Sequence, residues 1–380
     1  MSRVYSVNCS DYERENVYRA VDEMIKLYGG IDKIAKRGET VFLKINLVIK
    51  KHPDEAATTH PMVIEAVSKR LVENGCRVII GDSPGGPYNE KVLRGFYRIC
   101  GIEEAAKNSG AELNYDCSYS DYKTPDGCIS RVLTMIDPPF KCDRIITISK
   151  LKTHSMAVYT GAVKVLFGMI PGVLKVEYHF KMPEIHDFSN LLVDICETVK
   201  PSFSIIDGVV AMEGDGPTAG VPKNVGLLLA SENPYELDVC GAHIMGLKVE
   251  DVPTLKRSLE RGIIKGGIET VDIVGEDLDK YVSNFKVPKI RSVNFFRGRV
   301  PKRVEDFLTF YLSPRPEFSK DICIKCGVCV ESCPPKALKM GDKIPSIDYK
   351  KCIRCFCCHE LCPKKAISIK RPWILNRVFK

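Results

Sequence analysis

The feature that most constrains this chain is a cysteine pattern near its C-terminus, which occurs twice. The pattern is C-x2-C-x2-C-x3-C-P, and its two copies run over 323–334 and 352–363. They are 29 residues apart, and the Lys-Ala-Leu that follows the first copy returns as Lys-Ala-Ile after the second. The region is therefore a duplicated unit that brings eight thiols together.

This spacing resembles that of bacterial ferredoxins that hold two [4Fe–4S] clusters, in which the fourth cysteine of each copy binds the other cluster. The resemblance implies two ligand sets: Cys323, Cys326, Cys329 and Cys362 for one cluster, and Cys352, Cys355, Cys358 and Cys333 for the other. An alternative is that the two fourth cysteines, Cys333 and Cys362, are paired with the clusters the other way round. A structural zinc site is another alternative, since paired cysteines also bind zinc, but zinc does not explain the third cysteine and the Cys-Pro of each copy.

A ninth cysteine in this region, Cys357, is surplus to the pattern. We interpret it as a small packing residue near a cluster, with a ligand role as the alternative. The chain has 17 cysteines among 380 residues, no apolar run that resembles a signal peptide, and none of the roughly 18 apolar residues that a membrane span needs. Free thiols and clusters favour a soluble, cytoplasmic protein.

Alternating strand and helix patterns predict the fold of the remaining chain. Strand-like runs at 3–8, 40–48 and 77–82 alternate with helical periodicity at 13–28 and 61–75. Further helices are predicted at 90–107, 189–199 and 234–246, and further strands at 144–149, 203–207, 225–230 and 271–274. We therefore predict an α/β fold, with a mainly parallel sheet and flanking helices, followed by a small α+β ferredoxin-like domain.

We expect four segments: an α/β domain over 1–285, a basic connector over 286–317, the ferredoxin-like domain over 318–370 and a tail over 371–380. The connector has seven basic residues and no acidic one between Lys286 and Arg303, which accounts for most of the net charge of +8. Such a segment could attract an acidic redox partner. Its Phe295-Phe296 pair could also contact a nucleic-acid strand, but a solvated linker is the simpler interpretation, and we expect no nucleic-acid partner. We expect the tail to pack on the protein's own surface, with membrane contact as the alternative.

Polar residues follow several of the predicted strands. In a parallel sheet, ligands bind beyond the carboxyl ends of the strands. The candidates for substrate binding at these positions are Lys44, Asn46, Asp82, Ser83, Glu213, Gly214 and Gly216. Lys150, Lys152 and His154 follow the strand at 144–149 and share one side if the chain there is extended. For each of these residues, the alternative to ligand binding is an ordinary polar position at a strand end or in a solvated turn. Neither a dinucleotide fingerprint nor a P-loop motif occurs.

Several motifs between residues 35 and 250 resemble the domain-of-unknown-function 362 family, whose members are often fused to a ferredoxin-like unit. They include Lys150-Leu-Lys-Thr-His154, Thr160-Gly-Ala-Val-Lys164, Gly81-Asp-Ser-Pro84 and Met212-Glu-Gly-Asp-Gly-Pro217, together with Asp238. The resemblance implies an α/β fold and an iron–sulfur protein but no reaction. Val165 stands where many relatives have Asn, so any role for that amide is absent or moved in this chain.

Two classes of function fit these features. In the first, the protein is an oxidoreductase that passes electrons from its clusters to a small anionic substrate or cofactor. Lys152, His154 and Lys164 would then bind the anionic group and supply protons, while Asp82, Glu213 or Asp238 would orient it or bind a cation. In the second, the protein is a non-catalytic electron carrier or metal-handling protein that docks an acidic partner. The sequence specifies neither the substrate nor the oligomeric state.

Overall fold

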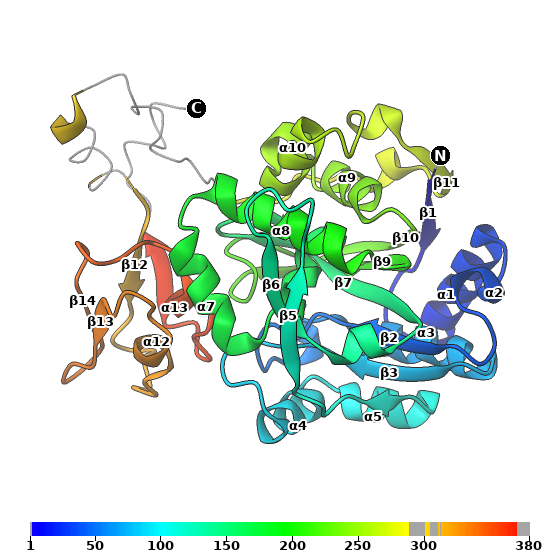
Figure 1. Ribbon diagram of the computed structural model, residues 1–380, viewed down its shortest axis with the longest axis horizontal. Helices are drawn as coiled ribbons and strands as arrows, with labels where there is room; N and C mark the ends of the chain where they lie inside the picture. Colours follow the sequence, from blue (N-terminus) through cyan, green and yellow to red (C-terminus); the bar gives the residue numbers. More distant parts are fainter. Residues whose placement is uncertain (1, 289–300, 305–310, 312, 371–380) are drawn as a thin grey trace.

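The computed structural model describes residues 2–288, 301–304, 311 and 313–370 (Figure 1). A nine-stranded sheet has the strand order β11-β1-β10-β9-β7-β2-β3-β4, with β8 paired to β7. The strands are β1 (Arg3–Asn8), β2 (Thr40–Lys44), β3 (Arg77–Gly81), β4 (Glu112–Leu113), β7 (Arg144–His154), β8 (Val158–Thr160), β9 (Phe203–Glu213), β10 (Val221–Ser231) and β11 (Asp272–Gly275). Most neighbouring pairs are parallel, whereas β10 and β8 pair antiparallel to their neighbours. This confirms the predicted fold class.

Helices cover both faces of this sheet. One face packs against α1 (Arg14–Tyr28), α3 (Pro61–Glu73), α4 (Glu90–Ile99) and α5 (Ile102–Ser109), and the other against α8 (Ile185–Val199), α9 (Pro234–Ile244) and α10 (Pro253–Glu260). The remaining elements are α2 (Ile31–Ile34), α6 (Ala162–Val165), α7 (Gly172–Lys181) and the hairpin of β5 (Tyr119–Lys123) and β6 (Val132–Ile136). Each face has its own hydrophobic core, and β7 between them is buried over nearly its whole length. Burial on both faces explains why Ile145, Ile146 and Ile148 are interspersed only with small polar residues, Thr147 and Ser149, before the polar end of β7.

Two predicted elements differ from the structure for local reasons. The predicted helix 90–107 is two helices, because Gly101 adopts a left-handed φ of 75° between them. The predicted strand 40–48 ends at Lys44, because the backbone N–H groups of residues 46 and 47 donate to side chains instead of a neighbouring strand. Asn46 N–H donates to Thr59 Oγ1, and Leu47 N–H donates to Asp82 Oδ2. The chain thus turns away from the sheet at the carboxyl ends of β2 and β3.

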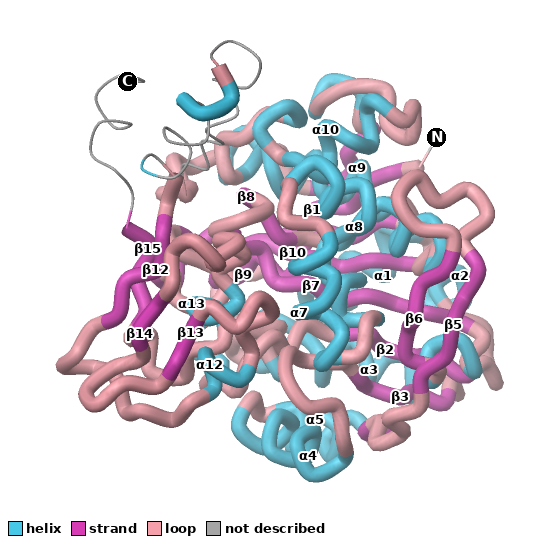
Figure 2. Tube along the Cα trace, turned by 60° about the vertical axis from the view of Figure 1, so that its left-hand side comes forward, coloured by secondary structure: helices cyan, strands magenta, loops and turns pink. Residues whose placement is uncertain are grey.

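The C-terminal unit is a small α+β domain built from two similar halves. It contains β12 (Arg315–Phe318), α12 (Val328–Glu331), β13 (Leu338–Lys339), β14 (Ser346–Ile347), α13 (Cys357–Glu360) and β15 (Ile367–Lys370). In Figure 2 its two small sheets lie apart from the large sheet, with α12 and α13 on the side that faces α7. α13 repeats α12 at the same offset of 29 residues that separates the cysteine motifs in the sequence.

Parts of two predicted segments lie outside the described residues. These are 289–300, 305–310 and 312 of the connector, with four of the seven basic residues between Lys286 and Arg303 and the Phe295-Phe296 pair, and the whole tail over 371–380. The boundaries of the four segments remain predictions. None of the helices in the described residues is long and apolar enough to cross a membrane, and the cytoplasmic location remains a prediction.

Candidate functional site

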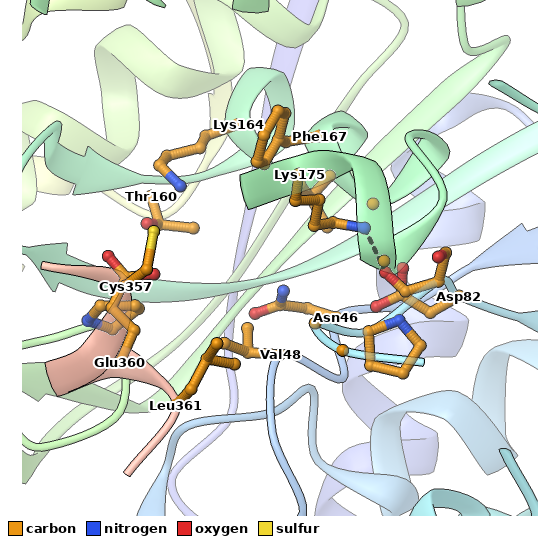
Figure 3. Close-up of a pocket in the computed structure, with 18 of the residues that line it drawn as sticks. Asn46, Val48, Asp82, Thr160, Lys164, Phe167, Lys175, Cys357, Glu360 and Leu361 are labelled. Carbon is orange, nitrogen blue, oxygen red and sulfur yellow. Dashed lines mark hydrogen bonds between the residues drawn. The ribbon is translucent and has the colours of Figure 1, made fainter. Parts of the chain in front are cut away.

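A pocket lies beyond the carboxyl ends of β2, β3 and β7, between α7 and α13 (Figure 3). Asn46 follows β2, Ser83 follows β3, and Lys152 and His154 lie on β7 itself. The pocket therefore occupies the place where an α/β sheet most often binds its ligand.

A buried ion pair lies beneath the pocket. Lys44 Nζ is 2.7 Å from Asp82 Oδ1, with side-chain exposures of 0% and 3%. The contact lacks hydrogen-bond alignment, so its attraction is mainly electrostatic. Asp82 also accepts a 2.7 Å hydrogen bond from Leu47 N–H. A β-carbon at Gly168 would lie 2.2 Å from Asp82 Oδ1, so only glycine allows the chain to pass this close.

Three lysine side chains give the pocket a positive field. Lys152 Nζ donates a 2.6 Å hydrogen bond to the Ala57 carbonyl, and Lys175 Nζ donates one of 2.6 Å to the Ser83 carbonyl. Lys164, from α6, points into the other end of the pocket (Figure 3). Burial lowers the pKa of all three ammonium groups, to about 7 for Lys175. An anionic ligand would offset this cost of burial.

The hydrogen bonds of His154 fix its tautomer. Its Nδ1 accepts from the backbone N–H groups of Met156 and Ala157, at 3.1 and 3.2 Å. The ring proton of the neutral imidazole therefore lies on Nε2, which is 3.5 Å from Glu360 Oε1. Burial, together with the charge of Lys164, holds the pKa of His154 well below its usual value. His154 is thus a neutral hydrogen-bond donor that points toward the pocket.

The C-terminal domain forms the wall of the pocket opposite α7. Cys357, Glu360 and Leu361 line the cavity together with the residues of the large sheet (Figure 3). Thr218 Oγ1 donates a 3.0 Å hydrogen bond to the Glu360 carbonyl, and a β-carbon at Gly85 would lie 2.9 Å from the Leu361 side chain. The pocket is therefore complete only when both domains are in contact.

Several buried polar atoms that face the pocket have no hydrogen-bond partner within the described parts of the chain. They are Asn46 Oδ1, Ser83 Oγ, Thr160 Oγ1, His179 Nδ1 and Glu360 Oε1. Buried polar atoms are nearly always hydrogen-bonded, because leaving one unpaired costs about 1–3 kcal/mol. Five of them around one cavity indicate that a polar ligand or ordered water completes the site.

Six of the predicted site residues line this one pocket: Asn46, Asp82, Ser83, Lys152, His154 and Lys164. Lys44 lies beneath it, paired with Asp82. Lys150, which we expected beside Lys152, instead pairs with Asp207 at 2.6 Å, because the register of β7 against β9 shifts between Lys150 and Lys152. The end of β7 therefore delivers Lys152 and His154 to the pocket but not Lys150.

The other predicted site residues have structural contacts away from the pocket. The Glu213 side chain pairs with Lys223 at 3.3 Å, while the Gly214 and Gly216 carbonyls accept hydrogen bonds from the end of β7. The Asp238 carboxyl accepts hydrogen bonds from two N–H groups at the start of α6, and burial raises its pKa to about 7. Asp238 thus holds in place the helix that carries Lys164.

Among the pocket residues that were not predicted as site residues, four have side chains with N–H, O–H or carboxyl groups: Thr160, Lys175, His179 and Glu360. Lys175 and His179 are four residues apart on α7, a spacing that places both on one helix face. Recognition of that helix would have revealed them. Glu360 gave no signal, because its place in the pocket depends on how the two domains meet.

The eight motif cysteines line two separate cavities in the C-terminal domain. Cys323, Cys326, Cys329 and Cys362 line one of about 360 Å³, and Cys333, Cys352, Cys355 and Cys358 line one of about 340 Å³. Left-handed residues recur at equivalent places in the two loops, as at Lys325 and Arg354. Backbone N–H groups donate to the sulfurs of Cys333 and Cys362, at 3.3 and 3.2 Å. Two four-thiol cavities with N–H···S bonds fit the donor set of iron–sulfur clusters.

Comparisons with known proteins agree with this arrangement. Residues 41–243 match the family described as domain of unknown function (DUF362), and residues 315–363 match a 4Fe-4S dicluster domain. A thylakoid-associated protein of Synechocystis sp. is 28% identical over 307 residues, which cover 79% of this chain and 92% of that protein.

A likeness to one solved structure is more distant. The lactate racemase apoprotein of Thermoanaerobacterium thermosaccharolyticum aligns with a TM-score of 0.40 and 11% identity, over 65% of this chain and 58% of that one. The chain thus spans less than two thirds of the length of that structure. The DUF362 match spans more than half of the chain, so the protein belongs to the DUF362 family and is an iron–sulfur protein with a 4Fe-4S dicluster domain at its C-terminal end.

Proposed function

We propose that the protein is an oxidoreductase in which two [4Fe–4S] clusters pass electrons to a small anionic substrate in the pocket. The first cysteine set (Cys323, Cys326, Cys329 and Cys362) would hold one cluster. The second cysteine set (Cys333, Cys352, Cys355 and Cys358) would hold the other. Bound clusters of this type supply single electrons.

The observation that carries this proposal is the position of Cys357. Its side chain lines the pocket and also lines the cavity of the second cysteine set. It lies between the ligands Cys355 and Cys358 in the chain and is buried. One side chain thus lies in the walls of both the pocket and the second cysteine cavity, which offers a short path for electrons. This interpretation gives the surplus cysteine a place in the wall between the two sites.

The side chains around the pocket suit reduction of an anion. Lys152, Lys164 and Lys175 would bind the negatively charged group, since these buried ammonium groups form no ion pair within the described parts of the chain. His154 Nε2–H would donate a hydrogen bond to the oxygen on which charge develops. The Lys175 ammonium, whose pKa is lowered to about 7, can then give up a proton near neutral pH. A carrier that only docks partners would have no use for these groups.

The proposal is tested by reoxidation of the reduced protein. Protein purified and reduced without oxygen is mixed with a panel of reducible carboxylates and phosphorylated compounds, and the recovery of cluster absorbance is followed. We expect at least one compound to reoxidise the wild-type protein more than tenfold faster than it reoxidises Lys164→Gln. Lys123→Gln, an exposed position on β5, serves as the control and should match the wild type. If every compound reacts equally with all three proteins, the pocket is not a reduction site.

A further inference from the structure

The two cysteine sets face different surroundings. In the first set, Cys326 is exposed to solvent, Cys323 and Cys362 are partly buried, and Cys329 is buried. The second set has no exposed member, and its cavity adjoins the substrate pocket through Cys357. One set therefore lies near the protein surface and the other near the pocket. This difference gives the C-terminal domain an outer and an inner end.

Exposed apolar side chains surround the outer end. Ile322, Ile324 and Met340 are 48%, 56% and 45% exposed, and Ile324 also lines the cavity of the first cysteine set. The Met340 methyl group is 3.9 Å from the place where a β-carbon of Gly327 would be, so Met340 packs beside the cysteine loop. Single exposed apolar residues are common, but a group beside one functional centre is typical of an interaction site.

Basic side chains frame these apolar residues. Lys320, Lys325, Lys339 and Lys343 are all exposed. The exposed acidic residues among or beside them are Asp321, Glu331 and Asp342, and Lys364 at the first cysteine cavity adds a further positive charge. Lys325 Nζ contacts the Asp342 carbonyl, which joins the two loops into one surface. We call this surface the docking face; it comprises Ile322, Ile324, Cys326, Met340 and the four lysines. Its positive charge favours an acidic partner.

We propose that the docking face binds an acidic protein that carries single electrons, and that electrons enter the protein there. In each encounter the carrier is oxidised by one electron and this protein is reduced by one electron at the first cysteine set. A small apolar centre with a charged rim is usual for transient electron-transfer complexes, which bury less than about 1,200 Å². The inference rests on the two-cluster assignment proposed above, but not on the identity of the substrate.

The test compares reduction by a protein and by a small molecule. Reduced flavodoxin serves as the acidic carrier and dithionite as the small reductant, and reduction of the full-length protein is followed by stopped-flow absorbance. The test variant is Lys339→Glu/Met340→Glu, which alters one lysine and one exposed apolar residue. Its matched control is Lys123→Glu/Val132→Glu, a cross-strand pair on the β5–β6 hairpin with Val132 47% exposed. Lys343→Glu tests the charge alone.

We expect the second-order rate with flavodoxin to fall about tenfold or more at low salt in the test variant, because steering by opposite charge raises association rates by about 10–1,000-fold. The rate should fall less in Lys343→Glu and stay unchanged in the control, and dithionite should reduce all four proteins alike. Iron content shows whether each variant keeps its clusters. If variants with full iron content react with flavodoxin at the wild-type rate, the docking face is not the site of electron entry. That result would leave the pocket proposal intact, because reoxidation by substrate is measured after dithionite reduction.

Discussion

The ion pair beneath the pocket gives the sharpest prediction about how the fold supports the site. Lys44 Nζ and Asp82 Oδ1 are 2.7 Å apart and almost completely buried. At an effective dielectric constant of 20, their attraction amounts to about 6 kcal/mol, which offsets the cost of burying both charges. Burial lowers the pKa of Lys44, and Asp82 opposes that shift. Each charge is therefore tolerated only because the other is present.

We predict that Lys44→Met or Asp82→Asn alone lowers the free energy of unfolding by about 3–5 kcal/mol, because either change leaves one buried charge unpaired. In the double variant, Asn can still accept the hydrogen bond from Leu47 N–H. We therefore expect the double variant to be destabilised by clearly less than the sum of the single variants, with a coupling energy of about 2–3 kcal/mol. Urea unfolding in oxygen-free buffer, followed by far-UV circular dichroism, measures all four proteins. Additive losses within about 0.5 kcal/mol would show that the two charges do not depend on each other.

Three further predictions follow from single contacts. Gly168→Ala should lower the free energy of unfolding in urea by about 1–3 kcal/mol, because the alanine β-carbon would lie 2.2 Å from Asp82 Oδ1. An unchanged urea midpoint would show that the chain at residue 168 does not pass this close to Asp82. The pKa of Lys175 is lowered to about 7, so its ammonium is present below pH 7 and lost above it, and the affinity of the pocket for anions should fall between pH 6 and 8. NMR titration of the labelled lysine side chain measures this pKa, and a value near 10 would refute the prediction. Lys365→Ala should change the free energy of unfolding by less than about 1 kcal/mol, since both partners of its 3.1 Å ion pair with Glu55 are about one-third exposed. A larger change, measured from the thermal unfolding transition, would mean that this pair holds the domains together.

The amino-acid sequence predicted the parts of this protein that depend on local patterns. The cysteine repeat specified two four-thiol cavities, and the alternation of strands and helices specified the sheet. Strand ends are also local features, and they led to Asn46, Ser83 and Lys152 in the pocket. The irregular register after Lys150 could not be predicted, because it depends on how β9 aligns with β7.

The contact between the two domains also could not be predicted from the sequence. Cys357 looked like a packing residue because nothing local shows that α13 faces the sheet. The structure places it in the pocket wall with Glu360, 150 or more residues along the chain from the strand ends that they face. Contacts across such separations are set by tertiary packing and leave no periodic pattern in the sequence.

The claim at the centre of this account is that one cluster lies beside the pocket and the other beside the docking face. An EPR-monitored redox titration of the oxygen-free protein tests it most directly, with Lys164→Gln and Lys325→Gln as paired variants. Each variant loses a positive charge, which makes a nearby cluster harder to reduce. We predict two midpoint potentials, with Lys164→Gln lowering one of them and Lys325→Gln lowering the other. A protein with iron for only one cluster, or one in which both variants shift the same potential, would contradict the account.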